Sequence, residues 1–215
     1  MDTLNTTKVG QLERKTQDRI VALFRDRLGY DYLGNFEERE ENNNVEEVYL
    51  RSFLLRSGHS EILIGKAIEK LKKCTNRPQM SLYDLNKETY SLLRYSAKER
   101  EKLGEHKQDV EFIDWEHPEN NHFAIAEEVT IKGNRTKRPD IVLYVNGIAV
   151  GVIELKRSIV SVSEGIRQNI GNQKEEFIKT FFGTVQLVMA GNDTEGLRYG
   201  TTETPEQHYL SWKET

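Results

Sequence analysis

Arg138-Pro-Asp-Ile-Val-Leu-Tyr-Val-Asn-Gly-Ile-Ala-Val-Gly-Val-Ile-Glu-Leu-Lys-Arg157 is the stretch that decides how this chain folds. Two apolar, β-branched runs, residues 141–145 and 148–153, flank Asn146-Gly147, a dipeptide that readily takes the positive φ values of tight hairpin turns. Nearly continuous apolar runs are typical of strands that are covered on both faces. The stretch therefore predicts a buried β-hairpin. Its ionisable residues stand at the hairpin ends: Asp140, Glu154 and Lys156.

These three ionisable residues define a candidate site. Side chains alternate along a strand, so Glu154 and Lys156 share a face while Leu155 points into the core. A two-residue turn with uninterrupted pairing would place Asp140 opposite Ile153, facing away from Glu154. We therefore predict a three-residue loop or a β-bulge in the hairpin, which would bring both carboxylates to one side.

Two carboxylates and a lysine at one sheet edge suit metal-assisted phosphodiester hydrolysis. Carboxylate oxygens are ligands that Mg²⁺ prefers, and a nearby ammonium can orient or activate a water for attack on phosphorus. Two structural alternatives are a Glu-x-Lys on the solvated face of a strand and a plain ion-pair network. The catalytic interpretation is favoured, because burying these charges without a partner or metal costs free energy.

The same residues resemble the PD-(D/E)xK nuclease motif. The two runs of the hairpin, with their charged ends, are similar more narrowly to the N-terminal nuclease domain of the type I restriction enzyme R (motor) subunit. The resemblance implies an α/β fold with a restriction-endonuclease-like core, a central mixed β-sheet of four to five strands flanked by α-helices, and a helical insertion. It also implies Mg²⁺-dependent cleavage of double-stranded DNA, with Asp140 and Glu154 as metal ligands and Lys156 as the residue that positions the water.

Two supporting residues follow from the resemblance. A carboxylate on the first helix often joins the site in these nucleases, and Glu13 is the match, although a solvated Glu13 fits the sequence nearly as well. Type I R subunits carry a Gln-x-x-x-Tyr motif on the helix after the hairpin. Gln168 matches the glutamine, whereas Asn172 stands at the tyrosine position, so Gln168 is expected near the site without the complete motif.

The resemblance covers essentially the whole chain and implies partners. In the family an ATP-driven motor follows the nuclease domain, and specificity and modification subunits complete the complex. We expect a nuclease domain at residues 1–195, with the insertion at about 45–100, and the start of a linker to the motor at 196–215. Mg²⁺ is the expected cofactor, with ATP for the full-length subunit only. The alternatives are a non-catalytic subunit-docking module and a stand-alone nuclease for branched or damaged DNA.

The chain itself shows no nucleotide-binding loop. Six residues separate Gly58 from Gly65, where a Walker A motif needs four, and Ala67 follows Lys66, where it needs Ser or Thr. Neither ATP binding nor ATP hydrolysis is expected of this chain alone.

Composition narrows the class further. The charged fraction is 31% and the mean hydropathy is −0.69, no apolar run approaches the length of a membrane span, and no signal peptide is visible. One cysteine cannot form an internal disulfide, and the histidines show no zinc-ligand spacing, so a cytoplasmic location is expected. The net charge of −4 argues against a surface that binds nucleic acid throughout. Local DNA contacts are expected from Lys137, Arg138 and Arg157. A second basic cluster, residues 66–77, fits a solvated helix face better.

Periodicity outlines the other elements. Helices are expected at residues 12–28, 45–56, 60–73, 82–95 and 161–180, the last opened by a capping box of Ser161 and Glu164. Further strands are expected at 110–115, 123–131 and 184–190, with a short extended segment near 30–34 and loops at 1–10 and 98–106.

Overall fold

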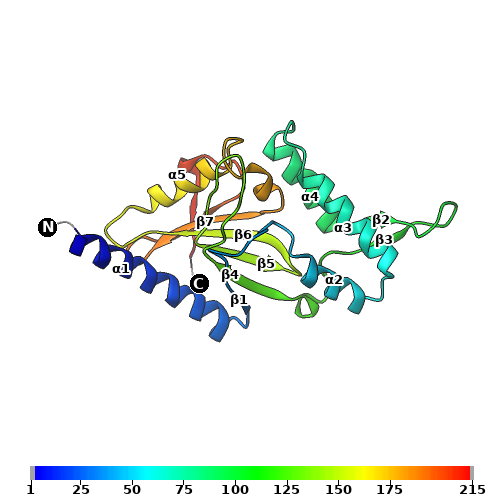
Figure 1. Ribbon diagram of the computed structural model, residues 1–215, viewed down its shortest axis with the longest axis horizontal. Helices are drawn as coiled ribbons and strands as arrows, with labels where there is room; N and C mark the ends of the chain where they lie inside the picture. Colours follow the sequence, from blue (N-terminus) through cyan, green and yellow to red (C-terminus); the bar gives the residue numbers. More distant parts are fainter. Residues whose placement is uncertain (1–2, 214–215) are drawn as a thin grey trace.

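A seven-stranded mixed sheet forms the centre of the computed structural model, which describes the backbone of residues 3–213 and the side chains of residues 13–213 (Figure 1). The strand order is β1-β4-β5-β6-β7-β8-β9. The β1/β4 and β6/β7 pairs are parallel and the other four pairs are antiparallel. The α/β class and the mixed sheet are confirmed. The strands span β1 (Asp31–Asn35), β4 (Phe123–Glu127), β5 (Ile141–Val145), β6 (Ile148–Leu155), β7 (Leu187–Asn192), β8 (Gly196–Gly200) and β9 (Leu210–Ser211).

The sheet has more strands than the four to five predicted, because short strands extend both of its edges. β1 was expected only as an extended segment. β8 and β9 lie in residues 196–215, which were assigned to a linker, and they pair with β7 and with each other. The folded domain therefore continues past residue 195, at least to Ser211, while residues 214–215 lie outside the described part. The sequence gives little indication of these two strands, because β9 has only two residues and β8 begins and ends with glycine.

The strand predicted at residues 110–115 is wrong. Only Val110 belongs to a strand, β3 (Gln108–Val110), which pairs with β2 (Ala97–Glu99) in a separate hairpin. Of the apolar residues that follow, Phe112 and Ile113 are buried without joining a ladder, whereas Trp115 is exposed. Asp114 ends the extended segment, because its Oδ1 accepts hydrogen bonds from the N–H groups of Glu116 and His117 and closes a turn. The loop expected at 98–106 correspondingly includes the end of β2.

Helices cover both faces of the sheet. α1 (Thr3–Ala22), continued by a π-helical turn at Leu23–Arg27, packs on one face, and α5 (Val162–Asn172) packs on the other. α1 begins earlier than predicted and includes most of residues 1–10. Gly10 lies inside the helix, where one glycine costs only about 1 kcal/mol. Residues 1–2 and the side chain of Leu12, the first residue of the predicted helix, lie outside the described part of the chain. α5 ends earlier than predicted, at Asn172.

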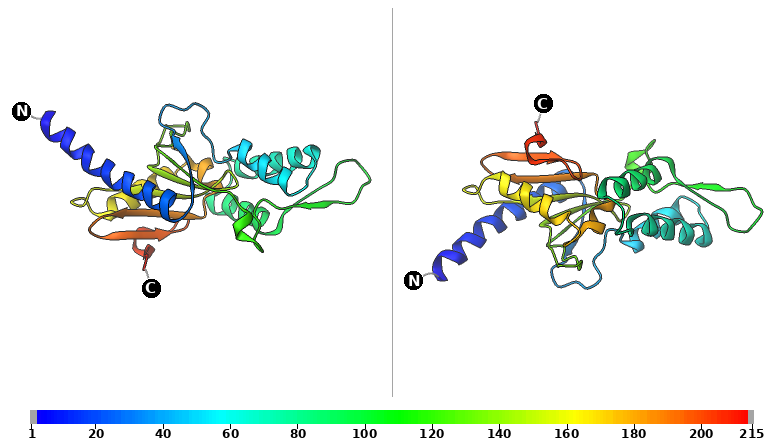
Figure 2. Two further views of the ribbon diagram at one scale, coloured as in Figure 1. Left: turned by 90° about the horizontal axis from the view of Figure 1, so that it is seen from below. Right: turned by 90° about the horizontal axis from the view of Figure 1, so that it is seen from above.

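The predicted helical insertion is present between β1 and β4. It consists of α2 (Glu47–Arg56), α3 (Glu61–Thr75), α4 (Leu82–Tyr95) and the β2/β3 hairpin. These elements share a hydrophobic core of their own, which meets the sheet at Ile148. Figure 2 shows the insertion and its hairpin projecting from the sheet on the side away from the N-terminus. No helix in residues 3–213 is long and apolar enough to cross a membrane.

Candidate active site

The hairpin between β5 and β6 contains the predicted bulge. Its turn is Asn146-Gly147, with φ values of +50° and +80°, as expected for a tight two-residue connection. The pairing shifts between Leu143 and Tyr144, so that Val150 on β6 has no partner on β5. One extra residue on one strand changes the register of every pair beyond it.

The shifted register brings two carboxylates side by side. Ile141 pairs with Ile153, so Asp140 and Glu154 take neighbouring positions on one face of the sheet. Asp140 Oδ2 accepts a hydrogen bond from the N–H of Leu155 at 2.6 Å. The hairpin prediction is therefore confirmed, and the opposite-face arrangement that would have separated the two carboxylates is not formed.

Glu154 is buried, and only one of its two oxygens has a partner. Its exposed fraction is 1%. Lys156 Nζ donates to Oε1 at 2.7 Å, whereas Oε2 has no hydrogen-bond partner. A buried polar atom without a partner is uncommon in folded proteins and calls for a physical explanation. A bound cation is one such explanation for a carboxylate oxygen.

Burial and neighbouring charges shift the pKa values of all three site residues. Burial raises the pKa of Glu154 to about 8, the nearby Asp140 carboxylate adds to that rise, and Lys156 opposes it. Burial also raises the pKa of Asp140 to about 6, against the hydrogen bond from Leu155. Burial acts to lower the pKa of Lys156, but the Glu154 carboxylate outweighs it and the net shift is upward. Lys156 therefore keeps its proton, while burial opposes ionisation of both carboxyl groups.

A surface depression of about 540 Å³ is lined by Lys156, whose ammonium donates to the buried Glu154. α1 supplies Glu13, the loop directly after β6 supplies Lys156 and Arg157, and α5 supplies Gln168. Glu13 also acts electrostatically on Asp140, Glu154 and Lys156. The fold thus gathers residues that are up to 155 positions apart in sequence around the carboxyl end of the central strand β6.

The three residues predicted to contact DNA have different surroundings. Arg138 forms ion pairs with Glu37 and Glu128. Lys137 lies over the ring of Phe177, with its Nζ 4.1 Å from the ring centroid. Arg157 lines the depression next to Lys156. Arg157 is therefore the one of the three that the fold brings to the candidate site.

Comparison with known proteins agrees with this geometry. The family described as type I restriction enzyme R protein N terminus (HSDR_N) matches residues 10–207. The chain belongs to this family.

Three curated proteins illustrate the relation. A putative type I restriction enzyme MjaIXP endonuclease subunit of Methanocaldococcus jannaschii is 24% identical over 86% of this chain and 19% of its own length. The HindI endonuclease subunit of Haemophilus influenzae is 27% identical over 66% of this chain and 14% of its own length. The SsaAORF53P endonuclease subunit of Staphylococcus saprophyticus is 26% identical over 49% of this chain and 11% of its own length. In each case the match covers less than a fifth of the relative.

The glutamine of the R-subunit motif and its missing tyrosine occupy different environments. Gln168 is exposed at the depression, as expected. Asn172, at the tyrosine position, is 1% exposed, and neither of its side-chain amide atoms has a hydrogen-bond partner. This R-subunit domain therefore keeps the first residue of the motif at the site and buries the second.

Sequence reasoning missed Glu127, a buried carboxylate at the end of β4. It accepts hydrogen bonds from Arg14 at 2.8 Å, Gln17 at 3.1 Å and Tyr32 at 2.7 Å. Burial alone would raise the pKa of Glu127, but the bonds from Tyr32 and Arg14 outweigh it and the pKa is lowered. Because Arg14 and Gln17 are on α1, this carboxylate fixes the helix that carries Glu13. The sequence contains the same indication for Glu127 as for Glu154, since each is a glutamate at or next to the end of an apolar strand.

Gly165, inside α5, packs directly on the site. A Cβ at this position would lie 3.1 Å from Ala190 Cβ, 3.4 Å from Lys156 Cγ and 3.5 Å from Glu154 Cγ. The missing side chain lets α5 approach β6 and β7 closely.

The R-subunit site offers two carboxylates rather than a complete cage. Within residues 13–213, no group of three or more His, Cys, Asp and Glu side chains is placed to hold a metal ion. Mg²⁺ commonly keeps several waters and uses only one or two protein carboxylates. The Asp140–Glu154 pair meets that smaller requirement.

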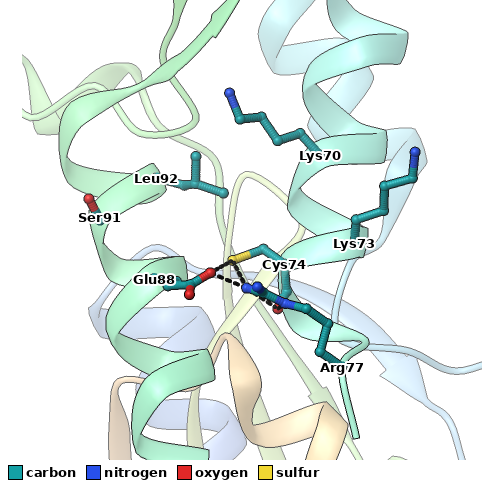
Figure 3. Close-up of a pocket in the computed structure, with 7 residues that line it drawn as sticks. All are labelled: Lys70, Lys73, Cys74, Arg77, Glu88, Ser91 and Leu92. Atoms are coloured by element: carbon teal, nitrogen blue, oxygen red, sulfur yellow. Dashed lines mark hydrogen bonds and ion pairs between the residues drawn. The ribbon is translucent and has the colours of Figure 1, made fainter. Parts of the chain in front are cut away.

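The basic cluster of the insertion is held by contacts within the protein, and Lys66 donates to the backbone oxygens of Arg100 and Glu101. Lys70, Lys72, Lys73 and Arg77 all form ion pairs with carboxylates. Figure 3 shows Arg77 reaching across from the end of α3 to Glu88 on α4, over the sulfur of Cys74. These contacts join α3 to α4 and its neighbours within the insertion.

Proposed function

We propose that this domain carries the nuclease active site of a type I restriction enzyme R subunit, and that it cleaves double-stranded DNA in a Mg²⁺-dependent reaction. The observation that carries the proposal is the half-bonded, buried Glu154 next to Asp140, with Lys156 at the adjoining depression. Family membership supports the same site, because the relatives described above are endonuclease subunits.

The residues fit a magnesium ion. Asp140 and Glu154 would hold it, since both present hard carboxylate oxygens and Glu154 Oε2 lacks any protein partner. A cation would also offset the burial that raises both pKa values, and the Asp140 charge that adds to the rise at Glu154. When bound, Mg²⁺ would supply a Lewis acid for a phosphoryl oxygen and lower the pKa of a bound water.

Lys156 would position the attacking water or the scissile phosphate. Its ammonium has three N–H donors, of which one is used by Glu154 Oε1 at 2.7 Å. Two donors remain for groups in the depression that Lys156 lines. Gln168 and Glu13 line the same depression, where the Gln168 amide would donate to the reacting phosphate and the Glu13 carboxylate would accept from the attacking water.

Further roles belong to the longer subunit. We propose that a motor region driven by ATP follows this domain, and that modification and specificity subunits assemble with it. The chain spans less than a fifth of the length of the relatives described above, which supports the part-subunit proposal over a stand-alone nuclease.

Metal titration and cleavage test the proposal together. Calorimetry with Mg²⁺ or Mn²⁺ should show binding to the wild-type domain, and loss of that binding in Asp140→Ala and Glu154→Ala. Glu119→Ala, which removes an exposed carboxylate, serves as the control and should bind like wild type. The full-length subunit with either site change should not cut DNA in the assembled enzyme. Normal cleavage, or metal binding that is unchanged in Asp140→Ala and Glu154→Ala, would favour a docking module instead.

A further inference from the structure

Arg157 lines two surface depressions. The first, of about 540 Å³, contains Lys156 and the other residues of the candidate site. The second, of about 270 Å³, lies between the loop after β6 and α1, where Lys15 and Arg19 line it. β6 contacts both α1 and α5, and Figure 1 shows both helices near the end of the sheet at which β6 terminates.

The two depressions together are positively charged on a chain whose net charge is −4. Their lining contains five cations and three carboxylates: Lys15, Arg19, Lys156, Arg157 and Arg167 against Glu13, Glu164 and Asp193. A basic surface that adjoins a nuclease site is the electrostatic footprint expected of a nucleic-acid contact.

Ion pairing separates these cations into two groups. Three of them are committed to carboxylates: Arg19 to Asp193, Lys156 to Glu154, and Arg167 to Glu164 and Glu206. Lys15 and Arg157 form no ion pair with any residue whose side chain is described. A cation that is not already neutralised can bind a phosphate without first breaking a protein contact. Arg138 is the contrasting case, since Glu37 and Glu128 hold it.

We propose that the backbone of double-stranded DNA runs from the Lys156 depression into the second depression, with its phosphates contacted by Arg157 and Lys15. The inference rests on the proposed function, because it starts from a scissile phosphate at Lys156. A strand presents one phosphate for about every 3.4 Å of helix axis, so further phosphates must follow the scissile one across the adjoining surface.

Salt dependence of DNA binding tests the path without any cleavage. Equilibrium binding of a labelled duplex to the domain is measured with EDTA across about 50 to 200 mM KCl, and the logarithm of the binding constant is plotted against the logarithm of salt concentration. Each phosphate contact contributes about 0.9 to the slope. The double variant Lys15→Gln/Arg157→Gln should therefore lower the slope by about 1.8.

A matched control removes the same charge from the insertion. Lys70→Gln/Lys73→Gln takes away two lysines that are paired with Glu99 and Glu69, and its slope should equal that of wild type. Thermal unfolding of each variant checks that the fold is kept.

Three outcomes would overturn the path. The slope of Lys15→Gln/Arg157→Gln could stay at the wild-type value, the control could lose as much slope, or Lys137→Gln/Arg138→Gln could lose the slope instead. Failure of the proposed function has a different signature. It appears as normal cleavage by the Glu154→Ala enzyme, whatever the slopes are.

Discussion

Substituting Gly165 by alanine should weaken cleavage without unfolding the domain. The added Cβ would sit 3.1 Å from Ala190 Cβ, closer than such contacts normally are, and 3.4 and 3.5 Å from the Cγ atoms of Lys156 and Glu154. The neighbours must then move by a few tenths of an ångström. Ala190 is part of the β7 backbone ladder and cannot move easily, so the displacement falls on α5 or on the two charged side chains.

Two opposing effects set the change in stability. Alanine in place of glycine inside a helix stabilises it by about 1 kcal/mol, whereas overpacking a close contact costs about 1 to 3 kcal/mol. The free energy of unfolding should therefore change by no more than about 2 kcal/mol. Catalysis is more sensitive, because a misplacement of about 1 Å can cost about 100-fold in rate. A shift of a few tenths of an ångström at Lys156 and Glu154 predicts a loss of about tenfold.

Gly171 provides the matched control in the same helix. A Cβ at Gly171 would meet nothing within 4 Å. Gly171→Ala should gain up to about 1 kcal/mol of stability and cleave like wild type. The assay is single-turnover cleavage by the assembled enzyme at saturating DNA, with DNA affinity and Mg²⁺ affinity measured separately. Gly165→Ala should lower the cleavage rate and the Mg²⁺ affinity while leaving DNA affinity unchanged. A wild-type cleavage rate for Gly165→Ala, or an equal loss in Gly171→Ala, would refute the reasoning.

Three further predictions follow from the same contacts. Lys156→Ala should abolish cleavage but leave measurable Mg²⁺ binding, since lysine is not a ligand; loss of both in calorimetry would assign Lys156 to the metal. The raised pKa values of Asp140 and Glu154 mean that the folded state holds more protons than the unfolded state between about pH 4 and pH 8, so stability in EDTA should fall as pH rises through that window. Glu154→Gln should flatten this dependence in thermal unfolding, and an unchanged profile would contradict it. Glu127→Gln should lower the free energy of unfolding by about 1 to 3 kcal/mol, because it weakens bonds from charged and phenolic donors in a buried position; it should also reduce cleavage through displacement of Glu13, and unaltered denaturant unfolding would count against the anchoring role.

The hairpin could be predicted because one rule of strand geometry decides it. Side chains alternate with a period of two. Asp140 and Glu154 can therefore share a face across this two-residue turn only if one strand contains an extra, unpaired residue, and Val150 is that residue. The edge strands had no comparable constraint. β9 has two exposed residues, and its pairing with β8 depends on contacts that leave no pattern in the sequence.

The surroundings of the cations could not be read from sequence for a different reason. Lys137, Arg138 and Arg157 look equivalent in a linear chain, as basic residues beside one motif. Their difference arises from partners far away, since Glu37 is 101 positions from Arg138. Gly165 belongs to the same class of residue, because its role depends on the distance between α5 and β6 and not on its own helix propensity.

Two strand-end glutamates have contrasting environments in this fold. Glu127 and Glu154 both end buried strands, and both are at most 3% exposed. Glu127 receives three donors over its two oxygens, and its pKa is lowered, so its charge is stabilised by the protein alone. Glu154 receives one donor and keeps Oε2 without a partner, and its pKa is raised to about 8. Divergent environments for similar groups commonly mark their division of roles in an active site. Of these two glutamates, only Glu154 keeps an oxygen without a protein partner, which is why the metal is proposed at Glu154 and the anchor at Glu127.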